Sequence, residues 1–233
     1  MFDSGREHAA RYLILVFGAV LASLLGLSVF HIPEPHLQRM EEEMGRARTG
    51  FYFIMGSLYA HGVVFEKDLT EASEWYRLAA DKRHARAQNS LGTLNFRGDG
   101  RPQNYAEAAK WFRLAAGQGL AEAQYNLGLM HEKGFGFLQD NAEAVRFYQL
   151  AAKQGHVTAQ TNLGTMYAEG RGVPQNYREA ANLYRLAAEQ GFEAAQLSLG
   201  FFCTRRATVC RRISPKLQSG IAFQLNKGMH QPA

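Results

Sequence analysis

The chain has 233 residues, 46% of them hydrophobic, with 26 lysines and arginines, 21 aspartates and glutamates, and two cysteines. This composition excludes a collagen, a wholly disordered chain and a disulfide-dense small domain, and the length suits one or two domains or one elongated array. The excess positive charge is confined to the C-terminal tail 201–233, which has six basic residues and no acidic one, so the preceding 200 residues carry 20 basic and 21 acidic side chains.

The first predicted element is an apolar helix over residues 12–30, a run of 19 residues without a charged side chain. At roughly 1.5 Å per residue it would be about 28 Å long, close to the ~30 Å hydrocarbon core of a bilayer. It predicts a single-pass transmembrane signal-anchor. A cleaved signal peptide, which would give a secreted protein, remains the alternative, although the candidate cleavage sites after Ala22 and Ser28 are poor matches.

Basic residues are slightly denser in the N-terminal tail 1–11 than after the span. This favours an orientation with the N-terminal tail on the cytoplasmic side of the membrane and the main domain on the periplasmic or lumenal side. Residues 31–49 contain two prolines and then a charged stretch, and they are expected to form a juxtamembrane spacer or a short helix.

Residues 50–200 repeat with a period of 36. The dipeptide Leu-Gly recurs at this spacing, and Met55-Gly56 fits the same frame. The recurrent dipeptides are Leu-Gly at 91, 127, 163 and 199, Ala-Gln at 87, 123, 159 and 195, and Ala-Ala at 79, 115, 151 and 187. A period of this length is typical of helical repeat architectures.

Each unit contains two helical patterns, as the third unit illustrates. Its first helix is predicted over 121–133, where apolar residues at i, i+4 and i+7 share one face and a Gly-x-Gly turn follows. Its second helix is predicted to end near Lys153, with Gly155 as a left-handed cap. It should begin with a capping box. In such a box the Asp140 side chain accepts a hydrogen bond from a backbone N–H of the first turn, and the Glu143 side chain accepts one from the backbone N–H of Asp140. The same box recurs as Asp68 with Glu71, Asn104 with Glu107, and Asn176 with Glu179.

Small and large residues also recur. Gly128 and Ala144 are predicted to lie where the two helices of a unit approach closely. Large residues are predicted to fill the layer between units; they are Trp75, Trp111, Phe147 and Leu183. Because only short links join the helices, neighbours must be antiparallel, and each unit must stack on the next to bury its second face.

These motifs resemble the Sel-one-like repeat, a relative of the tetratricopeptide repeats. The pattern Ala-Gln-x-x-Leu-Gly-x-x-Tyr-x-x-Gly-x-Gly-Val is most complete from Ala159 to Val173. The first unit has Phe51 and Tyr52 in place of Ala-Gln, which suggests a capping unit, and the fifth stops after one helix, with Pro215 where the capping glutamate should be.

The predicted fold is all-α: a right-handed tetratricopeptide-like α/α superhelix of four 36-residue helix pairs plus a final half repeat, preceded by the transmembrane helix. The resemblance implies a scaffold that holds other proteins together.

No catalytic, cofactor or metal site is predicted. The Gly-x-Gly turns follow no strand and lack the full phosphate-binding pattern, and His131-Glu132 has Phe135 where a zinc motif needs its second histidine. His84 and His156 share a repeat position, which favours a solvated edge over a metal site.

Cys203 and Cys210 do not form a Cys-x-x-Cys pair, and on one helix they would be about 10 Å apart, too far for a disulfide. If the tail is exported and irregular, they could pair. The resemblance also suggests, as an alternative function, a β-lactam-type hydrolase of the cysteine-rich repeat kind, but this chain lacks a cysteine pair in each repeat. The basic tail could be a solvated end, an accidental extension, or a segment that contacts anionic lipid or nucleic acid.

One face of the first helices varies between units and is the candidate partner-binding groove, with an ordinary solvated face as the alternative. Its residues are Asn89, Thr93 and Phe96, then Tyr125, Leu129 and Glu132, then Thr161, Thr165 and Ala168. The sequence therefore predicts a membrane-anchored, non-enzymatic scaffold or adaptor that binds a protein or extended peptide in a concave groove. It needs no cofactor or metal, and nucleic acid is not an expected partner.

Overall fold

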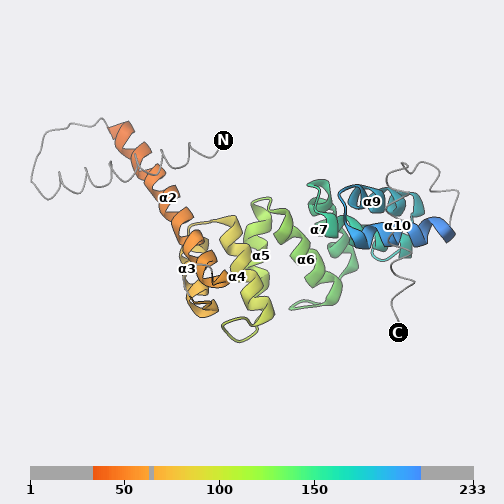
Figure 1. The fold of residues 1–233 in the computed structure, drawn as a ribbon, viewed down its shortest axis with the longest axis horizontal. Helices are drawn as coiled ribbons and strands as arrows, with labels where there is room; N and C mark the ends of the chain where they lie inside the picture. Colours follow the sequence, from red (N-terminus) through yellow and green to blue (C-terminus); the bar gives the residue numbers. More distant parts are fainter. Residues whose placement is uncertain (1–33, 63–65, 206–233) are drawn as a thin grey trace, which may run out of the picture. The chain divides into compact units, whose positions relative to one another are not determined.

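The computed structural model describes residues 34–62 and 66–205, and every regular element within them is an α-helix (Figure 1). The helices are α2 (Glu34–His61), α3 (Leu69–Asp81), α4 (Ala85–Arg97), α5 (Tyr105–Gly117), α6 (Ala121–Lys133), α7 (Asn141–Lys153), α8 (Val157–Glu169), α9 (Tyr177–Glu189) and α10 (Glu193–Arg205). The chain forms two compact units, residues 1–46 and 47–233, and the repeats lie in the second.

Within the second unit, the helices in extensive contact are neighbours in the chain, from α3 with α4 through to α9 with α10. The described residues 66–205 therefore form an all-helical repeat solenoid, as predicted. The predicted membrane span 12–30 lies outside the described residues. Among the helices that are described, none has both the length and the apolar character needed to cross a bilayer.

The helix boundaries follow the repeat frame closely. Helices α6 and α7 span the residues predicted for the third unit, and each of α3 to α10 is 13 residues long. Helix α2 is 28 residues long and runs through the predicted boundary at residue 50 without a break. Helix α10 continues to Arg205, and the rest of the basic tail, with Cys210, lies outside the described residues.

The predicted N-caps of the second helices are confirmed, but the capping box is only half formed. The Asp140 carboxylate accepts from the backbone N–H groups of Ala142 and Glu143, at 2.9 and 3.0 Å. The backbone N–H of Asp140 donates to the carbonyl of His131 on the preceding helix, at 2.9 Å, and not to Glu143. Because an intramolecular carbonyl already satisfies this N–H, the glutamate is not needed as an acceptor, and Glu143 instead pairs with Arg146.

A left-handed residue links the second helix of each unit to the next unit. Gly155 has a φ of 84°, as predicted, and the following His156 N–H donates to the carbonyl of Ala151. In the first unit the same place is taken by Arg83, whose φ is 63°. Glycine adopts this conformation without steric cost, whereas a side chain with a Cβ does not.

The recurrent glycines of the first helices lie against aromatic rings. A Cβ added to Gly128 would be only 2.6 Å from Cδ1 of Tyr148, which is fully buried. The ring of Tyr148 is therefore the nearest neighbour of Gly128 at the predicted close approach of the two helices, and at the equivalent Gly164 a Cβ would also lie 3.3 Å from the carbonyl oxygen of Ala180. The other glycine–ring pairs are Gly56 with Tyr76, Gly92 with Phe112, and Gly164 with Tyr184.

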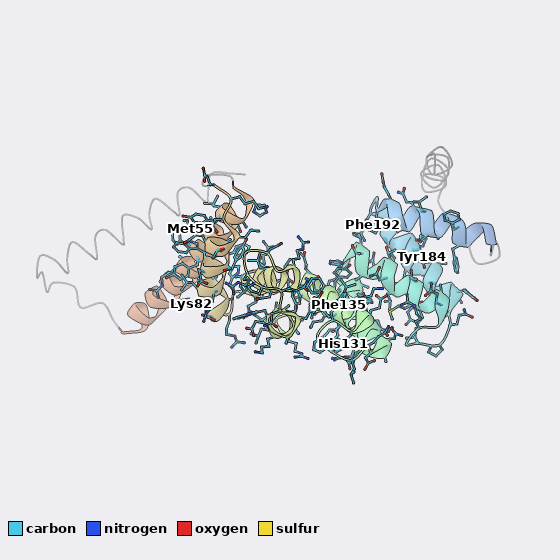
Figure 2. All side chains as sticks on the ribbon, turned by 90° about the horizontal axis from the view of Figure 1, so that it is seen from below. Met55, Lys82, His131, Phe135, Tyr184 and Phe192 are labelled. Atoms are coloured by element: carbon cyan, nitrogen blue, oxygen red, sulfur yellow. The ribbon has the colours of Figure 1, made fainter. Side chains whose placement is uncertain are left out.

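The layer between units contains the large residues predicted for it. Trp111 packs against the buried cluster around Tyr76, and Phe147 packs against the cluster around Phe112. Leu183 belongs to the cluster around Tyr148. Figure 2 shows side chains filling the spaces between successive helices. Trp75 differs, because it lies against Phe51 and Tyr52 on α2 of its own unit, with ring centroids 6.1 and 6.0 Å away. Only the second helices of the second to fourth units therefore contribute a large side chain that joins a unit to the preceding one.

Glutamine side chains form a second connection between units. The side chain of Gln118 donates to Gln88 at 2.7 Å, and Gln88 donates to the carbonyl of Ala80 at 3.0 Å. The same donation within a unit recurs as Gln154 to Gln124 and Gln190 to Gln160. Gln124 and Gln160 in turn donate to the carbonyls of Ala116 and Ala152 in the preceding unit, as Gln88 does to Ala80. This ladder explains why Ala-Gln recurs, since a buried amide needs partners for its donors and acceptor.

Candidate binding groove

A groove of about 800 Å³ runs along the first helices of the array. Helices α2, α4 and α6 contribute to it, together with the turn that precedes α8. Its lining residues are Phe53, Ala60, His61, Lys67, Leu69, Tyr76, Arg86, Asn89, Ser90, Thr93, Leu94, Arg97, Asp99, Leu120, Ala121, Glu122, Gln154, Gly155 and His156. A volume of this size is in the usual range of ligand pockets.

Helix α4 presents a polar stripe to the groove. Arg86, Ser90, Thr93 and Arg97 occur at i, i+4, i+7 and i+11, so they lie along one side of the helix. The Thr93 hydroxyl donates to the carbonyl of Asn89 within the helix, at 3.0 Å. Arg86 and Arg97 are exposed at opposite ends of the stripe. Helix α4 therefore offers a short polar centre between two cations.

Charges that line the groove are not neutralised by nearby partners. Lys67, Arg86 and Arg97 form no ion pair with the described residues, and neither do the acidic Asp99 and Glu122. Exposed unpaired charges have little effect on the stability of a protein, but they remain available to a ligand of opposite charge.

Two polar contacts hold the groove walls. The side-chain amide of Asn126 on α6 donates to the Asn89 side chain on α4 at 3.0 Å, which joins two successive first helices. At the rim, Nδ1 of His156 accepts from the backbone N–H of Ala159 and caps α8. Burial lowers the pKa of His156, although Glu122 acts in the opposite direction, and the lowered pKa keeps the ring neutral and able to accept.

The predicted groove residues do not all meet in this hollow. Asn89 and Thr93 line it, whereas Phe96 on the same helix α4 does not, and the other predicted residues lie on α6 and α8 of the later units. Phe96 lies against Tyr105 and Phe135, with ring centroids 5.2 and 5.5 Å away. Leu129 is half-buried on α6.

Tyr125 and the two threonines are partly occupied by internal contacts. The Tyr125 ring stacks on His156 with centroids 4.8 Å apart, and burial raises the pKa of its hydroxyl. Thr161 is buried and donates to the carbonyl of Val157, while Thr165 bonds to the hydroxyl of Tyr184 at 3.0 Å. The structure does not test whether these residues bind a partner, but it shows that they are not a freely solvated face.

Glu132 is a buried carboxylate at the junction of two units. It accepts from the Tyr148 hydroxyl at 2.7 Å, from Arg171 at 3.0 Å and from Lys133 at 3.1 Å. Burial alone would raise the pKa of Glu132, but these three donors lower it below its ordinary value. Burial and the nearby Glu132 carboxylate raise the pKa of the Tyr148 hydroxyl, so it stays protonated and donates.

Sequence reasoning missed several groove residues. Arg86, Ser90 and Arg97 could have been found, because they share the helical stripe of Thr93 on a helix that was predicted correctly. Glu122 and His156 could not, because they come from later units and reach the groove only through the stacking of helices. Among the described residues, no three histidine, cysteine, aspartate or glutamate side chains are grouped as metal ligands would be.

The stacked helix pairs define a helical repeat protein of the α-solenoid class. The Sel1 repeat profile matches four consecutive segments, residues 51–84, 85–120, 121–156 and 157–192. The chain therefore belongs to the Sel1 repeat family, whose members generally mediate protein–protein interactions as scaffolds.

Solved structures agree with this assignment. A Sel1 repeat protein from Oxalobacter formigenes is 31% identical, with a TM-score of 0.68 over 77% of this chain and 71% of its own. An immunity protein from Pseudomonas aeruginosa is 20% identical, with a TM-score of 0.50 over 80% of this chain and 71% of its own, and this likeness concerns the fold alone. A comparison with curated protein sequences gives no match.

Proposed function

We propose that the protein is a non-enzymatic scaffold that binds a protein or an extended peptide in the groove along its first helices. The observation that carries this proposal is the groove of about 800 Å³, with the polar stripe of α4 between two unpaired arginines. Such a surface offers hydrogen bonds and charge to a peptide backbone or side chain. The described residues offer nothing that favours the hydrolase alternative.

Groove binding is tested by blocking α4. Ser90→Arg combined with Thr93→Arg places two long side chains in the groove, and neither native side chain is fully buried. Crosslinking and mass spectrometry on the full chain would first identify a partner. We expect the affinity of that partner for the double variant to fall by about tenfold or more, equivalent to about 1.4 kcal/mol.

The matched control is Asn182→Arg, an exposed position in the middle of α9 that lies outside the groove. It should bind the partner like the wild type. Unchanged binding by the Ser90/Thr93 variant, with a normal thermal transition, would remove the groove from consideration and direct attention to the basic tail.

We further propose that residues 12–30 anchor the protein in a membrane as a single pass, with the repeat array on the periplasmic or lumenal side. The apolar length of this segment and the slight excess of basic residues before it support the proposal. The full chain should then remain in the membrane pellet after washing with alkaline carbonate and keep its first 30 residues. A soluble product that begins near Ser23 or Val29 would instead show a cleaved signal peptide.

A further inference from the structure

The junction between the first and second units contains a backbone feature that the other junctions lack. Arg83 has a φ of 63° and is the only residue other than glycine with a positive φ among those described. The equivalent residues of the later units are Gly119, Gly155 and Gly191, with φ of 84° to 87°. A non-glycine residue held in this conformation is strained, and such strain is often found where a side chain serves binding.

A separate hollow lies beside Arg83. Its volume is about 510 Å³, which suits a small ligand or a peptide end, and it shares no lining residue with the groove. Arg83 and Arg113 provide two cations, and Trp111 provides an aromatic surface.

Gly117, the last residue of α5, lines the hollow. A Cβ added to Gly117 would meet no atom within 4 Å. The equivalent residues of the other units are Asp81, Lys153 and Glu189, all with longer side chains. Gly117 therefore leaves space beside Trp111 that a longer side chain would occupy.

The two arginines are available to a ligand. Neither forms an ion pair with the described residues, and both are exposed. The Arg113 guanidinium lies 4.6 Å from the centre of the Phe137 ring, and this contact restricts its position. Asp81 also lines the hollow, so the charged side chains there sum to one positive charge.

We propose that this hollow, the Arg83 pocket, binds a carboxylate carried on an apolar body that lies against Trp111. Guanidinium groups bind carboxylates through paired charge-assisted hydrogen bonds, and the indole ring offers a large apolar contact. The repulsion from Asp81 favours a singly charged carboxylate over a doubly charged phosphate. The carboxylate could belong to the C-terminus of a peptide that ends in an apolar residue or to a free aromatic acid.

The fluorescence of Trp111 can report binding to the full chain in detergent. The chain contains two tryptophans, so Trp75→Phe leaves Trp111 as the only indole. The probes are the peptide acetyl-Ala-Ala-Leu-Phe with a free carboxylate, the same peptide as a C-terminal amide, phenylacetate and inorganic phosphate. We expect a saturable change with a carboxylate probe and affinity that is about tenfold weaker for the amide.

Two variants separate binding from folding. Arg83→Gly should weaken carboxylate binding by about tenfold and at the same time raise the melting temperature, because glycine relieves the strained φ. Gly117→Glu should also weaken binding, without unfolding, because its side chain enters the hollow from an unobstructed position. Arg77→Ala, an exposed arginine outside the hollow, should change neither property.

Each result decides the proposal. Binding of the peptide but not phenylacetate identifies a chain terminus as the ligand, and equal or tighter binding of phenylacetate identifies a small acid. The proposal is overturned if no carboxylate probe gives a saturable change up to about 10 mM, a very weak affinity. It is also overturned if phosphate binds more tightly than the carboxylates, if Arg83→Gly binds normally, or if Arg83→Gly melts at a lower temperature than the wild type.

Discussion

Replacing Gly128 with leucine should lower the free energy of unfolding by about 3 kcal/mol, the upper part of the usual range for overpacking a core. The new Cβ alone would lie 2.6 Å from the Tyr148 ring, which is fully buried and has no space into which to move. The two helices of the third unit would have to separate. Urea unfolding followed by circular dichroism measures this loss.

Gly117→Leu is the matched control, because its Cβ would meet no atom within 4 Å. Gly117 is exposed at the end of α5 and has no positive φ, so this variant should be as stable as the wild type or slightly more so. If Gly128→Leu and the wild type unfold at the same urea concentration, Gly128 does not pack against the Tyr148 ring as described.

Replacing Glu132 with alanine should also lower the free energy of unfolding by about 3 kcal/mol. The change leaves the buried Tyr148 hydroxyl without its acceptor and removes the carboxylate that Arg171 reaches from the following unit. Glu132→Gln keeps an acceptor for Tyr148 but removes the charge, so its loss should be smaller. A glutamine variant as unstable as the alanine variant would mean that charge, and not the hydrogen bond, dominates.

The pH dependence gives an independent test of Glu132. Its pKa is lowered in the folded protein, so the unfolded chain binds the proton more tightly. The stabilisation is therefore complete above the ordinary glutamate pKa of about 4.3 and is lost as the pH falls through the lower folded value. From pH 5 to pH 3 the wild type should lose more stability than Glu132→Gln, and parallel losses would contradict the assigned contacts.

The residues that line the groove were less predictable than the fold. Of the varied positions on the first helices, Asn89 and Thr93 line the groove, because helical periodicity places them on one side of α4; their role in binding stays a prediction. Glu132 was predicted by the same helical spacing to lie on the varied, partner-binding face, yet its side chain is buried. Its contact with Arg171 joins residues 39 positions apart, and no local pattern indicates such a pair.

Local sequence by itself determined the helices of this protein. The 36-residue period, the Asp and Asn N-caps and the glycine turns act within a few residues of chain, so they specify where each helix begins and ends. Tertiary stacking decided the rest. Once the two helices of a unit pack, the His131 carbonyl of the preceding helix accepts from the N–H that Glu143 was expected to cap, and the ring of Tyr148 fills the space over Gly128. Stacking also brings Arg83, which follows α3, and Trp111 of α5 to the same hollow. These residues are far apart in the chain, so no local sequence pattern indicates that the packed helices leave this space between them.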